Sequence, residues 1–185
     1  MLCLLLSVSF LLNAESATMN KVPEASQERS DRIRKTFDEV RVDTLYLLDE
    51  LYSDDMVFED PLGRMEGLEE FRIYMEAMYQ YVQEITWDYT DEVIQGDTHV
   101  LYWTMTLQTK GLNGGKPFSV DGTSHLKFNE EGNVYFHRDY FDMGAYVYER
   151  APVVKWFVNF VKRRLHKAVE DARETVQNQK TEVGK

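Results

Sequence analysis

The chain has little cysteine and no apolar run long enough to cross a membrane. Cys3 is the only cysteine among 185 residues, which excludes an internal disulfide and leaves the core to stabilise the fold. The apolar run at residues 1–12 contains two serines and is too short for a membrane span. Internal repeats and low-complexity blocks are also absent, so the chain is expected to form one domain.

Basic residues are also scarce relative to acidic ones. Lys and Arg number 21 against 32 Asp and Glu, which gives a formal net charge of −11. A general nucleic-acid binder is excluded because that function needs a basic surface. The same charge would repel an anionic substrate at long range unless a local basic patch offsets it. Aromatic residues make up 13% of the chain and favour a folded domain with a substantial core.

Two interpretations of the N-terminus stay open. Residues 1–17 have the apolar core and the small residues of an export signal, but no Lys or Arg precedes that core. Alternatively, translation starts at Met19 and the protein is cytoplasmic, which we favour because nothing in the remainder demands an oxidising compartment. We therefore divide the chain into an N-terminal extension at 1–25, a domain at 26–170 and a disordered tail at 171–185.

Helical periodicity dominates the first half of the domain. Apolar residues at helical spacing predict a helix at 30–43, a short helix that Asp43 can cap, and a third helix after Gly67. A short strand is predicted at 56–60, before the third helix.

Alternating patterns follow in the second half. They predict a meander of strands at 85–89, 99–110, 118–128 and 134–141. Helices followed by such a meander are typical of an α+β fold, in which a curved antiparallel sheet is covered by helices. A sheet covered in this way leaves a pocket at its wide end.

The hairpin between the last two strands is the most informative stretch. A type I turn with Gly132 in the left-handed position sets His125 against His137. Because cross-strand partners share a face, one face is predicted to carry the ionisable residues Asp121, His125, His137 and Asp139. A slip of one residue would move every side chain of a strand to the other face.

A carboxylate beside an imidazole in a partly dry cavity can act as an acid/base pair. The alternative is a passive polar lining in which these side chains only satisfy one another. His125, His137 and Asp139 could also be imagined as ligands for Zn or Fe(II). Since no helical histidine pair or supporting cysteine accompanies them, we expect no metal.

Two stretches carry a family resemblance. Asp121–Leu126, Gly132 and His137–Asp142 are similar to the last strands of SnoaL-like proteins in the nuclear transport factor 2-like superfamily, and Tyr52–Gly63 is similar to their early part. The likeness spans residues 30–165. It implies a cone-shaped α+β barrel with one pocket, a homodimer and no cofactor. It implies no single activity, because the superfamily includes isomerases, cyclases, dehydratases, epoxide hydrolases and pure binding modules.

Arg138–Asp142 also resembles the closing strand of limonene epoxide hydrolase. In that family the first Asp of the motif helps to activate the attacking water, which implies the role of a base for Asp139. Three other positions of that mechanism carry residues that cannot replace the family's Tyr, Arg and second Asp, namely Phe58, Trp103 and Met105. Asp60 stands where the family has an Asn and could still accept a hydrogen bond. Epoxide hydrolysis by that route is therefore not expected.

The last predicted helix, at 153–170, is unusual for so acidic a chain. Between Lys155 and Lys167 it holds five Lys or Arg and no acid, opposite an apolar face. This composition is compatible with an anionic membrane surface. The interpretation that we favour is a helix packed over the open end of the sheet, with its basic face solvated or paired with the acidic body.

Two functional hypotheses result. The first is a cofactor-free hydrolase, isomerase or cyclase for a hydrophobic substrate, in which Asp139 is the base, His137 orients it or shuttles a proton, and Asp121 assists. The candidates for contact with the substrate are Asp60, Phe58, Tyr46, Trp103 and His125, although core packing is the ordinary interpretation of the aromatic ones. The second is a non-catalytic module that uses the pocket for a ligand, or the last helix for a membrane or a partner.

Overall fold

The computed structural model describes residues 24–150 and, beyond them, positions 154, 156, 159–164, 166–167 and 169–170. Six strands form one sheet: β1 (Tyr52–Asp60), β2 (Gly63–Glu66), β3 (Val82–Gln95), β4 (Thr98–Thr109), β5 (Phe118–Phe128) and β6 (Val134–Phe141). Their order is β2-β1-β6-β5-β4-β3, in which β1 and β6 are parallel and all other neighbours are antiparallel.

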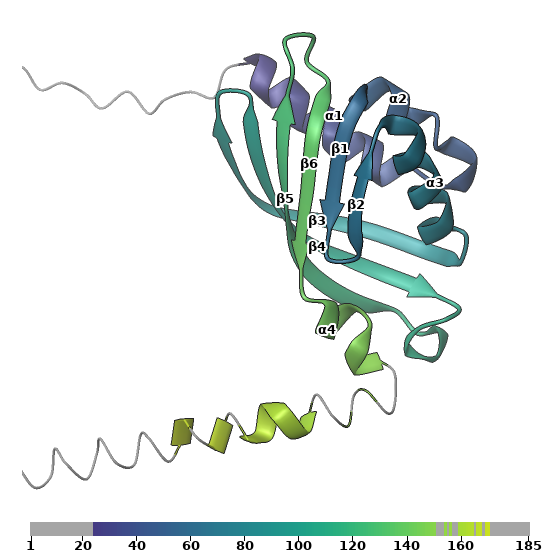
Figure 1. The fold of residues 1–185 in the computed structure, drawn as a ribbon, viewed down its shortest axis with the longest axis vertical. Coiled ribbons are helices and arrows are strands. Elements are labelled where there is room, and N and C mark those ends of the chain that lie inside the picture. The colour runs from purple at the N-terminus through teal and green to yellow at the C-terminus, as the bar shows by residue number, and fades with distance from the viewer. Residues whose placement is uncertain are drawn as a thin grey trace, which may run out of the picture.

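The helices are α1 (Glu24–Glu39), α2 (Leu47–Leu51), α3 (Leu68–Tyr79) and α4 (Met143–Tyr146), with short 3-10 turns at Val42–Thr44, Asn113–Gly115 and Tyr148–Arg150. The first three lie on one side of the strongly curved sheet, and α4 follows β6 at the opposite end of that strand from the hairpin (Figure 1). The predicted α+β class with a curved, helix-covered sheet is confirmed.

One local prediction is wrong, and one strand was not predicted. Asp43 caps no helix, because it lies inside the 3-10 turn and α2 begins later, after Tyr46. The strand that was not predicted is β2. Strand β2 follows a turn in which Oδ1 of Asp60 accepts hydrogen bonds from the backbone N–H groups of Leu62 at 2.8 Å and Gly63 at 3.0 Å. This turn folds the chain back on β1.

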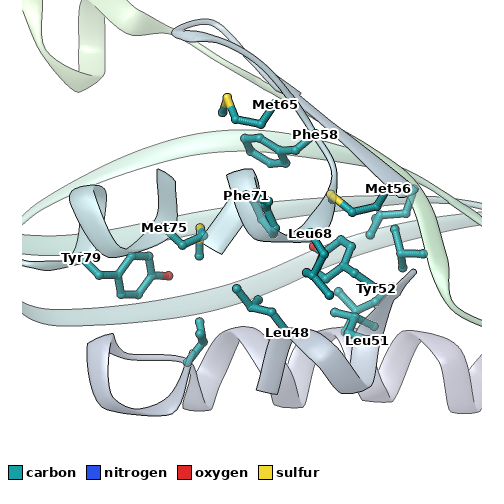
Figure 2. Packing of buried hydrophobic residues seen from close by; sticks show 14 of the residues in the cluster. Leu48, Leu51, Tyr52, Met56, Phe58, Met65, Leu68, Phe71, Met75 and Tyr79 are labelled. Carbon is teal, nitrogen blue, oxygen red and sulfur yellow. The ribbon is translucent and has the colours of Figure 1, made fainter. Parts of the chain in front are cut away.

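The hydrophobic core extends over the helices and the inner face of the sheet, and a large part of it lies between α3 and β1 (Figure 2). Helix α3 buries Phe71, Met75 and Tyr79, which recur at helical spacing. The ring centroid of Phe71 lies 5.1 Å from that of Tyr52 and 4.7 Å from that of Phe58, both on β1. Full burial of a side chain such as Phe71 contributes about 1.5–3 kcal/mol to stability. This packing fixes β1, and with it two residues of the site described below.

Helix α1 is attached to the sheet by a polar cluster. Glu92 on β3 accepts hydrogen bonds from Ser30 and from Arg34, the latter at 2.6 Å, and Ser30 Oγ lies 2.9 Å from Nδ1 of His99. Ser30 and His99 are fully buried. Burial alone would raise the pKa of Glu92, but the hydrogen bonds of His99 and Ser30 and the charge of Arg34 outweigh it and lower the pKa.

A close approach between two strands occurs at Gly122. Gly122 on β5 pairs with Trp103 on β4, and a Cβ added to the glycine would lie 2.1 Å from Cη2 of the indole. The indole can therefore lie across β5 only because position 122 has no side chain. This placement carries the indole N–H to Ser124, where it donates a hydrogen bond of 2.8 Å.

The described positions of the last predicted helix do not show the expected packing. Trp156 is 66% exposed and Phe160 is 40% exposed, and their rings stack on one another at 6.0 Å. Membrane contact by this helix stays a prediction. Within the described residues, no helix is both long enough and apolar enough to cross a membrane. The predicted N-terminal extension up to residue 23 and the tail at 171–185 lie outside the described residues.

We expect Gly122→Ala to destabilise the protein by about 1–3 kcal/mol, because the added methyl group must displace a buried indole. Urea denaturation followed by circular dichroism would measure the loss. Gly111→Ala is the matched control, since a Cβ at that position meets no atom within 4 Å. Equal stability of the two variants would show that the indole does not depend on Gly122.

We expect Glu92→Gln to lower the free energy of unfolding by about 1–3 kcal/mol at neutral pH, the range for hydrogen bonds to charged groups. The folded-state pKa of Glu92 is lowered, so its contribution is present above the unfolded pKa of about 4.3 and is lost as pH falls through the folded pKa. Urea denaturation at neutral and at acid pH should show the difference from wild type shrinking in acid. Glu84→Gln, at an exposed position of the same strand, is the charge-matched control. A difference that is independent of pH would contradict this assignment.

Candidate functional site

The last hairpin is offset by one residue from the predicted register. Leu126 pairs with His137 and Ser124 pairs with Asp139. The cause is a bulge at the start of β6, where Tyr135 is an extra residue between two paired positions. As a result, His137 and Asp139 point to the interior as predicted. Their partners on β5 are Leu126 and Ser124, which lie on the buried face of that strand.

Asp121 and His125 lie on the outer face, so their predicted place in the site is wrong. Asp121 is exposed and accepts a hydrogen bond of 2.7 Å from the hydroxyl of Thr104. The ring of His125 packs 5.6 Å from that of Phe136, and burial, with nearby positive charges, lowers its pKa. The alternative of a His125–His137–Asp139 metal site is excluded by this geometry. Across the described residues, no group of three or more His, Cys, Asp or Glu could hold a metal ion.

The prediction that Tyr46 belongs to the site is also wrong, since this residue is 61% exposed at the start of α2 and is not in the lining of the cavity that contains Asp139. The segment that carries it is a 3-10 turn followed by a short helix, whose buried residues are Leu48 and Leu51. Those leucines, and not the tyrosine, face the core.

Asp139 is the centre of a hydrogen-bond chain. Its Oδ1 accepts from the hydroxyl of Ser124 at 2.5 Å and lies 2.8 Å from Nε2 of His137. Ser124 in turn accepts from the indole N–H of Trp103 at 2.8 Å, and Nδ1 of His137 lies 2.7 Å from the hydroxyl of Tyr52. Four side chains from β1, β4, β5 and β6 thus act on a single carboxylate oxygen.

The direction of this chain follows from Tyr52. Its hydroxyl is fully buried, and burial, followed by the charge of Asp139, raises its pKa well above the ordinary value. The hydroxyl therefore keeps its proton. We assign it as the donor to Nδ1 of His137, because Nδ1 is the one hydrogen-bond partner of this buried hydroxyl among the described residues, and Nε2–H then donates to Asp139. In this assignment the imidazole is neutral and every donor points toward Asp139.

Asp60 is the second carboxylate of the site, at the end of β1. Tyr74 on α3 donates to its Oδ2 at 2.5 Å, and its Oδ1 is held by the backbone turn after β1. Burial, followed by the hydrogen bond to Asp60, raises the pKa of Tyr74, so this phenol also remains a donor. Asp60 is therefore fixed in position by its turn and by α3.

Both carboxylates line one partly open cavity of about 90 Å³ between α3 and the sheet. Phe58 and Trp103 line it as predicted, together with Met105. The other lining residues are Phe37, Phe71, Tyr74, Met75, Met78, Tyr79, Val82, Ile85, Trp87, Leu107, Phe141 and Tyr146. His137 lies behind Asp139, against a smaller hollow of about 20 Å³. An apolar vestibule of about 510 Å³ shares Met78, Val82, Leu107 and Tyr146 with the cavity.

Four residues of the site were missed by the sequence prediction: Tyr52, Tyr74, Trp87 and Ser124. A signal existed for Ser124. Phe118, Val120, Leu126 and Phe128 are buried at even positions of β5, and Ser124 has the same parity. For the two tyrosines the sequence offered no signal beyond apolar periodicity.

The arrangement leaves specific groups free for a ligand. Oδ2 of Asp139 has no hydrogen-bond partner in the described part of the chain, and the side chain retains 18% exposure. The side chain lines the cavity, so this oxygen is free to accept a hydrogen bond from a ligand. The indole N–H of Trp87 is buried without a hydrogen-bond partner among the described residues and is a potential donor. Such a site can take a proton from a bound molecule or from water, and return it.

Comparison with known proteins gives one family and several similar structures. The profile of the SnoaL-like domain matches residues 32–137, more than half of the chain. An NTF2-like protein of unknown function from Exiguobacterium sp. 255-15 is 23% identical with a TM-score of 0.52, over 62% of this chain and 98% of that one. No protein with a curated description matches the chain.

Two further structures are similar. A protein with a ketosteroid isomerase-like fold from Catenulispora acidiphila, solved in complex with trimethylamine, is 17% identical with a TM-score of 0.57, over 68% of this chain and 92% of that one. A proposed SnoaL-like polyketide cyclase from Jannaschia sp. CCS1 is 15% identical with a TM-score of 0.59, over 68% and 95%. At these identities the likeness to solved structures establishes the fold alone.

Proposed function

Because the chain belongs to the SnoaL-like family, we propose that it is a cofactor-free enzyme that binds a small, largely apolar molecule and moves a proton on it with Asp139. The observation that carries the proposal is the asymmetry of the Asp139 carboxylate. Its Oδ1 receives two hydrogen bonds from side chains, its Oδ2 has no partner in the described residues, and the side chain lines an aromatic cavity.

The two oxygens have different tasks in this proposal. The donors on Oδ1 fix the rotation of the carboxylate, because Ser124 and His137 approach it from two strands. Oδ2 then lies where a bound molecule can present a C–H or O–H group. Aromatic walls limit the access of water, which strengthens the electrostatic interactions in the cavity.

Proton abstraction next to a carbonyl is the reaction class that we favour. Oδ2 of Asp139 takes the proton, and the C–H electron pair moves into an enolate. The protonated Asp139 then returns the proton to another carbon, which is isomerisation. In ring closure the enolate carbon attacks a second carbonyl, whose π electrons move to its oxygen, and that oxygen takes the proton from Asp139. Epoxide hydrolysis by the route of limonene epoxide hydrolase is disfavoured because Phe58, Trp103 and Met105 cannot replace the Tyr, Arg and second Asp of that route.

The alternative is a binding module in which the same cavity holds a ligand without turnover. The observation in its favour is the small number of polar groups that face the cavity. Homodimer formation stays a prediction, because only one chain is present.

We expect Asp139→Asn to slow proton exchange by about 10²–10⁴-fold, the usual contribution of a general base. The measurement is deuterium exchange at the carbon next to the carbonyl in a panel of small cyclic ketones, followed by NMR. Asp121→Asn changes the same charge on the outer face and should leave the exchange rate unchanged.

Equal exchange rates in wild type and Asp139→Asn would contradict the proposal. Ketones that bind to the wild-type protein but show no exchange would favour the binding module. Circular dichroism and thermal melting of each variant would confirm that the fold is retained.

A further inference from the structure

The charge of the cavity has one sign. Asp60 and Asp139 are the two ionisable acids among its lining residues, and neither Lys, Arg nor His lines it. Asp60 forms no salt bridge within the described residues, and the single ion-pair partner of Asp139 is the imidazole of His137, which the chain of donors assigns as neutral. Hydrogen bonds therefore stabilise both carboxylates, and neither pairs with a Lys or Arg within the described residues.

The walls of the cavity are aromatic faces and edges. Trp87 and Trp103 meet edge to face with centroids 5.1 Å apart, and Trp103 lies 6.4 Å from Phe141. On the other side the rings of Phe58 and Tyr74 lie 5.6 Å apart. The face of an aromatic ring carries negative electrostatic potential and attracts a cation within about 6 Å of its centroid.

These observations favour a positively charged ligand. An uncompensated carboxylate in an apolar cavity is costly, and a bound cation offsets that cost. Conversely, an anionic ligand would add charge of the same sign to two carboxylates, in a chain whose net charge is −11. A neutral apolar ligand would leave both carboxylates without a counter-charge.

We infer that the cavity binds a small organic cation, an amine or a quaternary ammonium group attached to an apolar body. The cationic head lies between Asp139, Asp60 and the aromatic rings, and the apolar body extends toward the vestibule through Met78, Val82 and Leu107. This inference rests on the site of the proposed function and names its ligand class. It also supplies the charge that would stabilise an enolate formed between two carboxylates.

Three probes of similar shape separate charge from volume. Choline carries a trimethylammonium group, 3,3-dimethylbutan-1-ol is its neutral carbon analogue, and 3,3-dimethylbutanoate is an anion with the same tert-butyl group. Titration by ligand-observed saturation-transfer NMR would give the dissociation constants for the full chain. We expect the cation to bind at least about tenfold more tightly than the alcohol, since a desolvated cation–aromatic contact alone is worth about that factor.

Three variants locate the charge that is responsible. Asp139→Asn and Asp60→Asn should each weaken choline binding by about tenfold and leave the alcohol unchanged. Asp121→Asn removes the same charge from the outer face and should alter neither. If one cavity variant fails to fold, the other still tests the inference.

Four outcomes would overturn the inference. They are equal binding of choline and the alcohol, tighter binding of the anion, equal weakening by Asp121→Asn and the cavity variants, or no saturable binding of choline at millimolar concentration. The trimethylammonium group has no acidic proton on nitrogen for Asp139 to take, so choline binding does not depend on turnover. Proton exchange and cation binding can therefore fail independently of each other.

Discussion

The carboxylate of Asp139 receives its hydrogen bonds from protein side chains on one oxygen, and the geometry of the site depends on that arrangement. Ser124 and His137 hold Oδ1, while Trp103 and Tyr52 hold Ser124 and His137. Three of the four links cross between strands and the fourth joins His137 to Asp139 within β6, so the chain forms only when the strands have their observed register. A carboxylate held in this way presents its second oxygen to the cavity in a fixed direction, which acid/base chemistry and cation binding both require.

The residues of β5 explain how the sheet makes this arrangement possible. Gly122 gives room for the indole of Trp103, and the indole reaches across to Ser124. Within the stretch from Asp121 to Leu126, the residues that help to build the hydrogen-bond chain at Asp139 are therefore Gly122 and Ser124, which face inward. Its ionisable members, Asp121 and His125, face outward.

The sequence predicted the strands of the last hairpin with their correct bounds, because strict alternation and a strong turn define them. It predicted His137 and Asp139 as interior residues for the same reason. It failed for Asp121 and His125 because the bulge at Tyr135 shifts the pairing by one residue, and a bulge leaves no mark on the alternation of either strand alone. The apolar parity of β5 was the better guide, since burial of Phe118, Val120, Leu126 and Phe128 fixes which face is inside. Tyr52 and Tyr74 could not be found from sequence, since their roles depend on contacts with residues distant along the chain.

The position of the protons along this hydrogen-bond chain can be measured directly at the imidazole ring of His137. A long-range ¹H–¹⁵N correlation spectrum of the histidines, with His137→Gln to identify its signals, would locate the ring proton. The account predicts a neutral imidazole with its proton on Nε2 and an unprotonated Nδ1 that accepts from Tyr52. A proton on Nδ1, a proton on both nitrogens, or averaging between the two tautomers would contradict it.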